Sequence, residues 1–461
     1  MIVLKFGGTS VGDAESIDRA AAIVRGRLPG RPAVVVSAMG GATNALLALG
    51  EQASHGHLIG AARGVEALRE RHLAAVHALI PDADAATELS AELSAMLDEL
   101  ARLAEAISVL GYLTPRSKDT IASYGELLSA HLVTAAFRAR GIPAELVDAR
   151  RVMITDDNFC KATPDADAIA EAARAHLLPL LREGRVPIVG GFVGATAAGV
   201  TTTLGRGGSD YSASLIGAAL QADAIEIWTD VDGMLTADPR IVPAARLIER
   251  IRFDEASELA SFGAKVLHPS TIDPAVRRGI PVYVYNSRRP DGHGTLITSD
   301  APRRAVSAIA AKSSTTVIKL RSTRMLLAPG FMRTVFEIFE RHRASIDVVA
   351  TSEVSVSVTL DDPSNNEALI SDLRALGDAS VEPNRGIVSI VGAGLSDDGS
   401  ALARAFAALG GVHVHMASLS ATGINLTLVL DAVHVAPAMQ RLHAAFFETP
   451  ESSHPAAGVT A

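Results

Sequence analysis

The sequence predicts an α/β domain with a mainly parallel sheet, followed by two small ferredoxin-like α+β modules. Short β-rich runs alternate with helical runs through the first three hundred residues, which is typical of a parallel sheet. A βαββαβ order then follows and is largely repeated. The chain has 461 residues, 48% of them hydrophobic, and is longer than a single hydrophobic core ordinarily accommodates, so two or three domains are expected.

Composition excludes several classes of protein. The net charge of -9 argues against nucleic acid as the main partner, because duplex binding needs a basic surface. The single cysteine, Cys160, excludes an internal disulfide and a cysteine metal cluster, and it fits a reducing compartment. No apolar run approaches the roughly 18 to 20 residues of a membrane helix, and the first residues lack a signal-peptide pattern. We therefore expect a cytoplasmic protein.

The first domain is predicted to cover residues 1–300. It opens with a βαβ unit, because the runs "IVLKF" and "PAVVVSAM" flank "AESIDRAAAIVRGRL", which has helical spacing. Residues 58–141 are almost wholly helical, and leucines three and four apart predict an amphipathic helix packed on its neighbours. Strands return in "AELVDA", "RVPIVGGFVG", "AIEIWTD" and "IPVYVYN". A polar stretch rich in Pro, Gly and Arg, residues 287–304, then marks a boundary.

The two predicted modules cover residues 315–384 and 386–448. The first reads as βαββαβ and the second repeats most of that order, with exchange of strands between the modules left open. His413 and His415 alternate along a predicted strand of the second module. A polar strand face is favoured over a metal pair, since no third ligand is evident. The tail, residues 449–461, is small, polar and predicted to be disordered.

The stretch "LKFGGTSVGD" places Lys5 and a glycine pair directly after the first strand. Glycines let the backbone approach an anion closely, and the N-terminus of the following helix favours negative charge. A tight strand-to-helix connection explains the same pattern. Thr9 and Ser10 fit either ligand contact or helix capping.

A second motif, "TTTLGRGGSDYSA", surrounds Arg206 with hydroxyls and three glycines. Ser209 and Asp210 are predicted as the N-cap and the first turn of a helix. The motif predicts a concave anion site, in which the Arg206 fork suits a carboxylate. An ordinary glycine-rich hairpin before a capped helix is the alternative.

Two further motifs are ambiguous by themselves. In "IWTDVDGMLTADPR", Thr229 and Asp230 follow a predicted strand at the edge where open α/β sheets bind ligands, and "DPR" closes the next loop. Either aspartate fits a turn equally well. In "FGAKVLHP", Lys265 is suited to a phosphate, but solvation explains it as well.

Taken in order, "KFGGTSV", "SAMGGATN", "GELLSA", "TTTLGRGGSDYSA", "WTDVDG…TADPR" and "FGAKVLHP" resemble the signatures of aspartate kinase, in the amino-acid kinase superfamily. Residues 330–360 resemble the first of the two regulatory ACT modules of lysine-responsive aspartate kinases. The resemblance covers nearly the whole chain except the tail. It implies a three-layer amino-acid-kinase domain with tandem ACT modules, and a monofunctional enzyme without a fused homoserine dehydrogenase.

The resemblance implies MgATP-dependent phosphorylation of the β-carboxylate of L-aspartate to 4-phospho-L-aspartate, the first step toward lysine, threonine and methionine. A carboxylate nucleophile is already ionised, so positioning and charge neutralisation suffice. Two alternatives remain: a kinase for another acidic substrate, such as glutamate or N-acetylglutamate, and a catalytically idle regulator that binds amino acids.

The resemblance also implies roles for individual residues. Lys5 would meet the transferring phosphate and Asp210 would orient it, with Gly7 and Gly8 presenting backbone N–H groups. Substrate-binding residues would be Thr43, Glu126, Phe192, Arg206 and Ser209, with Glu126 on the ammonium group and Arg206 on the α-carboxylate. The nucleotide would be lined by Lys5, Phe6, Gly7, Gly8, Thr229, Asp230, Leu235, Arg240, Lys265 and Val266. Leu235 departs from the tyrosine of many relatives, and Mg²⁺ would arrive with ATP rather than at a protein metal site.

An effector pocket is implied for the first module. Its residues would be Met325, Gly330, Phe331, Met332, Ser345, Ile346, Asp347, Thr351, Ser352 and Glu353. Asp347 and Glu353 suit the ammonium groups of lysine, and backbone around Phe331 suits its carboxylate. Lysine is therefore the predicted inhibitor, with threonine as the alternative, and we expect a homodimer through the ACT modules, or a tetramer.

Overall fold

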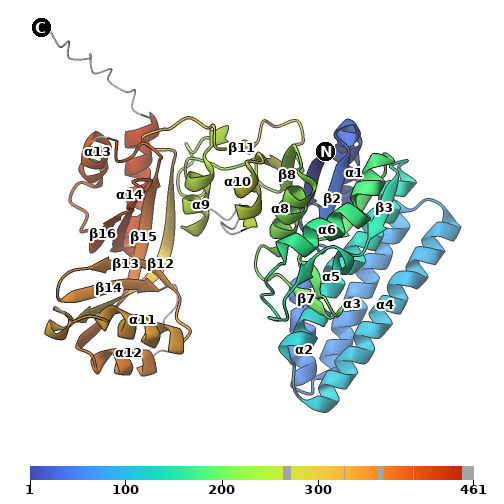
Figure 1. Ribbon diagram of the computed structural model, residues 1–461, viewed down its shortest axis with the longest axis horizontal. Coiled ribbons are helices and arrows are strands. Elements are labelled where there is room, and N and C mark those ends of the chain that lie inside the picture. Colours follow the sequence, from blue (N-terminus) through green and yellow to red (C-terminus); the bar gives the residue numbers. More distant parts are fainter. Residues whose placement is uncertain (263–270, 327, 361–366, 398, 449–461) are drawn as a thin grey trace, which may run out of the picture. The chain divides into compact units, whose positions relative to one another are not determined.

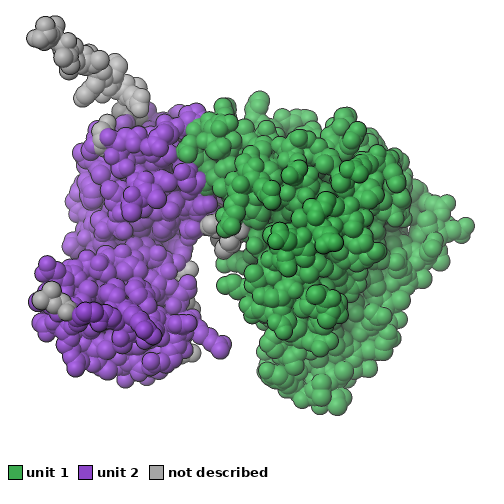
Figure 2. Space-filling model, in the orientation of Figure 1, with its two compact units in different colours: residues 1–234, 249–253, 266–301 green, residues 235–248, 254–265, 302–461 purple. Residues whose placement is uncertain are grey.

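The computed structural model describes residues 1–262, 271–326, 328–360, 367–397 and 399–448, so the predicted tail lies outside the described residues. The chain divides into two compact units (Figure 2). Unit 1 comprises Met1–Met234, Glu249–Phe253 and Val266–Ala301, and unit 2 comprises Leu235–Ile248, Asp254–Lys265 and Pro302–Ala461. Among the described residues, none of the helices combines the length and apolar character needed to cross a membrane.

Unit 1 is built on an eight-stranded sheet in the order β3-β5-β2-β1-β8-β10-β11-β9. Its strands are β1 (Ile2–Phe6), β2 (Pro32–Val36), β3 (Ala144–Val147), β5 (Val186–Gly190), β8 (Ala224–Thr229), β9 (Arg250–Ile251), β10 (Val282–Asn286) and β11 (Thr295–Ile297). All pairs from β3 to β10 are parallel, and β11 runs antiparallel to β10. The predicted mainly parallel sheet is therefore confirmed.

Helices cover both faces of this sheet, which gives three layers (Figure 1). One face is covered by α1 (Ala14–Arg27) and α5 (Pro115–Ala139), with α2 (Ala42–Ser54), α3 (Leu58–Leu79) and α4 (Ala83–Leu110) packed outside them; the other is covered by α6 (Ala166–His176), α7 (Leu178–Arg182), α8 (Gly208–Leu220) and α10 (Asp273–Arg278). The leucine periodicity of α4 buries Leu89, Leu93, Leu97 and Leu100. The amphipathic helix predicted there is confirmed.

A small sheet lies beside the main one and leads into α8. It has the order β4-β6-β7, formed by β4 (Ile154–Thr155), β6 (Val193–Thr196) and β7 (Thr201–Thr203). The single strand run expected in "RVPIVGGFVG" is thus two strands, β5 and β6, because the chain turns at Gly191 and Phe192 to change sheets.

Unit 2 contains one six-stranded antiparallel sheet in the order β13-β14-β12-β15-β17-β16. Its elements are β12 (Ala308–Arg321), α11 (Phe331–Arg341), β13 (Ile346–Thr351), β14 (Ser355–Leu360), α12 (Glu367–Arg374), β15 (Asp378–Val391), α13 (Gly399–Leu409), β16 (Met416–Leu419), β17 (Asn425–Asp431) and α14 (Ala432–His443). Short helical turns occur at Leu28–Gly30, Ala149–Arg151, Thr323–Met325 and Ala444–Glu448.

The two modules share strands β12 and β15, which pair along their whole length. The second half of β12 and the first half of β15 belong to the first module, and the other halves belong to the second. Residues 308–312 therefore supply the strand that the second repeat lacks in sequence. The prediction of two separate strands at "ASVEP" and "GIVSIVGAG" is wrong, because both lie in β15.

Segments that precede residue 300 pack into the core of unit 2. Ala237 and Val242 join the hydrophobic cluster of the second module. Glu255, on α9 (Phe253–Ser261), is fully buried and accepts hydrogen bonds from Ser307 Oγ and the Ala393 N–H, both at 2.7 Å. These contacts fix α9 to the second module.

His413 and His415 precede a strand rather than alternating along one. The predicted strand began at Val412, whereas β16 begins at Met416. Val412 and Val414 pack against the core before ladder pairing starts, which produced the alternating pattern. His415 Nε2 lies 3.1 Å from Asp431 Oδ1, so His415 belongs to an ion-pair cluster on β17.

Candidate active site

Unit 1 contains a cavity of about 680 Å³ at the carboxyl ends of its parallel strands. Turns after β1, β2, β5 and β7 contribute to its wall together with one side of α5. The predicted residues that line it are Lys5, Gly8, Thr43, Glu126, Phe192, Arg206, Ser209 and Asp210. Residues more than two hundred positions apart in sequence therefore meet at one site.

Two glycine turns form the floor of the cavity by packing on each other. A Cβ on Gly8 would lie 2.9 Å from the Ala38 carbonyl oxygen, and one on Gly40 would lie 3.2 Å from the Gly8 oxygen. A side chain at Gly8 therefore requires backbone movement. The predicted free N–H of Gly7 is wrong, because it donates to the Trp228 carbonyl at 3.0 Å.

Lys5 and Asp210 form an ion pair inside the cavity. Lys5 Nζ lies 2.6 Å from Asp210 Oδ1, and the two side chains are 10% and 14% exposed. The contact does not have hydrogen-bond geometry, so its attraction is chiefly electrostatic. Lys5 thus lies near the end of β1, and Asp210 lies in the first turn of α8.

Glu126 is a buried carboxyl without a full set of partners. It lies on α5 with 3% of its surface exposed, and its Oε2 atom has no hydrogen-bond partner. Burial raises the pKa of Glu126 to about 8, although the Ala38 N–H and the Lys5 charge partly oppose this shift. A cationic ligand group in the cavity would satisfy the open oxygen and restore the ionised form.

Arg206 lies on the turn between β7 and α8 and remains exposed. Within the described residues it has no ion-pair or hydrogen-bond partner, so its guanidinium is available to a ligand. The prediction of Ser209 as N-cap is wrong, because α8 begins at Gly208 and Gly207 caps it with φ of 72°. Ser209 instead lines the cavity.

Phe192 borders the cavity in an unusual backbone conformation. Its φ is 63°, a left-handed value that is uncommon outside glycine and is often found at binding sites. Its N–H donates to Ser212 Oγ at 3.0 Å. The neighbouring turn is packed so closely that a Cβ on Gly208 would lie 2.7 Å from the Phe192 ring.

Thr229 and Asp230 lie at the carboxyl end of β8, as predicted, next to the end of β1. Ser10 joins these strand ends, since its Oγ lies within hydrogen-bond distance of both the Trp228 carbonyl oxygen, at 3.1 Å, and Ser287 Oγ, at 2.8 Å. Helix α1 is capped by Asp13, so Ser10 is not its N-cap. Phe6 is fully buried.

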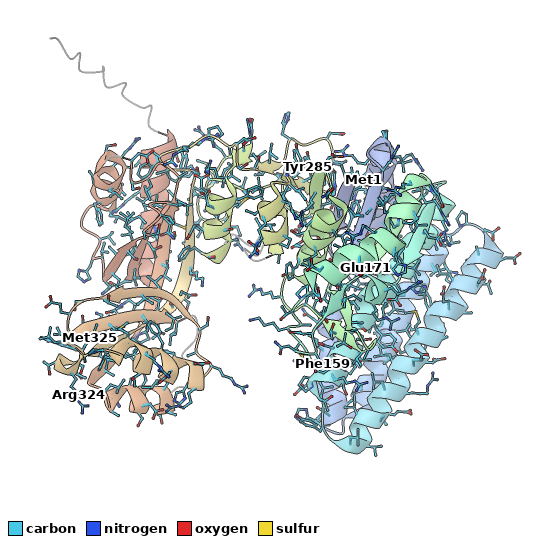
Figure 3. All side chains as sticks on the ribbon, in the orientation of Figure 1. Met1, Phe159, Glu171, Tyr285, Arg324 and Met325 are labelled. Carbon is cyan, nitrogen blue, oxygen red and sulfur yellow. The ribbon has the colours of Figure 1, made fainter. Side chains whose placement is uncertain are left out.

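A hydrogen-bond cluster after β8 was missed by the sequence analysis. Asn286, at the end of β10 beside Tyr285 (Figure 3), donates to Asp232 Oδ1 at 2.7 Å, and Arg289 pairs with the same carboxylate. These bonds hold the loop after Thr229 against the neighbouring strand. The residues "NSRR" match no recognisable motif, but their position at the end of a predicted strand could have indicated a role at the sheet edge.

The remaining nucleotide candidates lie outside unit 1 or outside the described residues. Leu235 and Arg240 belong to unit 2. Arg240 is bound bidentately by Asp238, with the shortest contact at 2.6 Å. Lys265 and Val266 lie outside the described residues.

The effector candidates form two groups at opposite ends of β13. The first group lies where β13 ends and α11 begins, and it comprises Met325 (Figure 3), Gly330, Phe331, Met332, Thr351, Ser352 and Glu353. The second group lies where β13 begins, and it comprises Ser345, Ile346 and Asp347. Asp347 and Thr351 are separated by about 13 Å of strand. Asp347 Oδ2 lies 3.1 Å from Lys312 Nζ.

Among the described residues, no group of three or more His, Cys, Asp or Glu side chains is arranged to hold a metal ion. Mg²⁺ bound with a nucleotide is held chiefly by phosphates and water, with one or two protein carboxylates. A Cβ on Gly7 would lie 3.6 Å from Lys5 Nζ, so the glycine turn passes directly beside the lysine.

A buried lysine beside glycine turns at a parallel sheet edge suits phosphoryl transfer, and opposite charges across one cavity suit a charged amino acid. The fold and cavity define an amino acid kinase. In agreement, the amino acid kinase family matches residues 1–286, and an ACT domain family matches residues 388–446.

Individual relatives define the family further. The chain is 39% identical over 458 residues to lysine-sensitive aspartokinase 3 of Escherichia coli, covering 97% of this chain and 99% of that protein. It is 36% identical over 469 residues to the chloroplastic aspartokinase 1 of Arabidopsis thaliana, covering 98% and 81%. The chain therefore belongs to the aspartokinase family.

Solved structures agree. The crystal structure of E. coli aspartokinase III in complex with aspartate and ADP matches with a TM-score of 0.84 and 38% identity, covering 97% of this chain and all of that one. The same enzyme in complex with lysine and aspartate matches with a TM-score of 0.82 and 38% identity, covering 97% and 99%.

Proposed function

We propose that this chain transfers the γ-phosphoryl group of ATP to the β-carboxylate of L-aspartate, which yields 4-phospho-L-aspartate and ADP. The observation that supports this most directly is the convergence of Glu126, Arg206 and Lys5 on one cavity. L-Aspartate has one ammonium group and two carboxylates. Each of its charges thus has an opposite charge available in the cavity wall.

Each residue has a distinct task in this reaction. Glu126 binds the ammonium group, Arg206 holds the α-carboxylate bidentately with Ser209 and Thr43 nearby, and Phe192 limits the pocket. Lys5, oriented by Asp210, neutralises charge on the transferring phosphoryl group. The β-carboxylate is ionised at neutral pH and attacks without a general base.

The nucleotide site is proposed from the strand ends of β1 and β8. Gly7, Gly8, Thr229 and Asp230 border it, and Leu235, Arg240, Lys265 and Val266 remain candidates from the resemblance. The complex of the E. coli relative with ADP supports a nucleotide in this family. Mg²⁺ accompanies ATP and offsets phosphate charge when bound.

For regulation, we propose feedback inhibition by lysine at the first ACT module. A relative is named lysine-sensitive, and its structure with lysine supports the same effector here. The effector residues lie at both ends of β13, farther apart than a lysine side chain extends. A second copy is therefore proposed to complete each site, which favours a homodimer through the ACT modules, in the cytoplasm, at the first step of lysine, threonine and methionine synthesis.

The reaction is tested by following ADP release with MgATP and, separately, L-aspartate, L-glutamate and N-acetylglutamate. We expect turnover with L-aspartate and not with the other two acids. N-acetylation removes the ammonium group that Glu126 would bind, and the longer side chain of glutamate misplaces its carboxylate. Preference for another acid would favour the related-kinase alternative. No turnover with any of them would favour the catalytically idle regulator.

A further inference from the structure

Asp119, on α5, binds two separate chain segments at the edge of the active cavity. It is 1% exposed and lines the cavity. Its Oδ1 atom accepts a hydrogen bond from Thr203 Oγ1 at 2.6 Å, and its Oδ2 atom accepts from the Thr203 N–H at 3.0 Å. The Cys160 N–H donates to both oxygens, at 3.0 and 2.9 Å. The carboxylate is therefore fully used within the protein.

Both segments bound by Asp119 support the turn that holds Arg206. Thr203 is the last residue of β7, three positions before Arg206. Cys160 lies under the same turn, because a Cβ on Gly205 would lie 3.2 Å from the Cys160 carbonyl oxygen. The two segments are also joined directly, since the Ala162 N–H donates to the Thr203 carbonyl at 2.9 Å.

The backbone at Cys160 has a cost that Asp119 offsets. Its φ of 68° is a left-handed value, which is unfavourable for a non-glycine residue unless its surroundings enforce it. The hydrogen bonds from its N–H to the buried carboxylate supply that enforcement.

Asp119 and Glu126 are seven residues apart on α5, so they lie on the same face two turns apart. We propose that α5 sets the spacing between the two groups that bind the amino-acid substrate: it bears Glu126 directly, and it fixes the Arg206 turn through Asp119. This inference rests on the proposed function. Asp119 is a positioning residue, because its oxygens are occupied by Cys160 and Thr203.

The test is Asp119→Asn. Asparagine keeps the size but offers one acceptor oxygen, and its NH₂ group must face an N–H donor. We expect the KM for aspartate to rise about 10-fold or more, because a displaced Arg206 guanidinium weakens the binding of aspartate alone. The kcat and the KM for ATP should stay within about twofold of the wild-type values. Asp156→Asn is the matched control, because Asp156 caps the same loop through the Asn158 and Thr163 N–H groups.

Thr203→Val provides a second variant if Asp119→Asn does not fold. It removes the hydroxyl donor and keeps the N–H, so a smaller rise in the KM for aspartate is expected. If the double variant folds, its KM should not exceed that of Asp119→Asn, because both changes break one contact. An unchanged KM for aspartate, or an equal rise for ATP, would overturn the inference. An inactive wild-type enzyme would instead overturn the proposed function.

Discussion

At the scale of the residue, the proposed contact between Glu126 and the ammonium group makes aspartate binding depend on the protonation of Glu126. Because burial raises its pKa to about 8, the free enzyme at pH 7 holds this carboxyl mainly neutral. An ammonium group binds the ionised form. The acid therefore loses its proton when aspartate enters, and alkaline pH favours binding.

This predicts a pH profile. The kcat/KM for aspartate should rise about tenfold per pH unit below pH 8 and level off above it, because only the ionised fraction binds. Initial rates from pH 6 to pH 9 provide the measurement. The Glu126→Gln variant should have a low kcat/KM for aspartate that does not rise with pH. An equally steep pH profile in that variant would assign the titration to another group.

Substitutions of Lys5 and of Arg206 should change different kinetic constants. Arg206→Ala should raise the KM for aspartate about 10- to 100-fold, since a charge-assisted hydrogen bond contributes about 1.5–3 kcal/mol. Lys5→Met should lower kcat about 100-fold or more, because its charge acts on the transition state. Steady-state kinetics with each substrate varied would distinguish them. The assignments fail if the Lys5 variant changes only KM.

The sequence could predict those residues but not Asp119. Lys5, Arg206 and Asp210 occur in short contiguous motifs whose chemistry is visible locally. Asp119 acts through Cys160 and Thr203, which are joined to it only by tertiary folding. Its position on the same helical face as Glu126 was the available signal.

At the scale of the element, β12 connects the two modules and places Lys312 against Asp347. Their side chains are 19% and 20% exposed, so the pair is largely shielded from solvent. If an effector ammonium group binds Asp347, it competes with Lys312.

Lys312→Met should therefore lower the lysine concentration that gives half inhibition, by about threefold to tenfold. Lys319→Met is the matched control, because Lys319 lies on the same strand and pairs with Glu382 at 2.7 Å. Inhibition curves and calorimetric lysine titrations provide the measurement. Weaker inhibition in Lys312→Met would mean that Lys312 helps to form the site.

Strands β1, β2, β8 and β10 could be predicted from the sequence, because their apolar runs and the polar residues after them are local. The first half of β12 was missed. Residues 308–312 are alanine-rich, with weak β propensity, and the β15 partners that pair with them lie some eighty residues later in the chain. Pairing of this kind is decided by tertiary structure.

At the scale of the whole molecule, the separation of the effector residues predicts sites shared between two copies. Asp347→Ala and Glu353→Ala should each abolish lysine inhibition. Dimers that contain one Asp347→Ala chain and one Glu353→Ala chain should regain inhibition in part, because one of their two sites then contains both intact residues. Inhibition measured after co-expression with two affinity tags tests this. Mixed dimers that stay insensitive would place both residues in one chain's site.

Phosphoryl transfer to aspartate within the cavity of unit 1 is the proposed reaction. Trapping with hydroxylamine tests it most directly, since hydroxylamine converts an acyl phosphate to a hydroxamate, whose complex with ferric ion is coloured. With MgATP and L-aspartate, we expect hydroxamate in proportion to ADP, and a loss of about 100-fold or more in Lys5→Met, which should still bind aspartate. ADP release without hydroxamate, or equal hydroxamate from Lys5→Met, would contradict it.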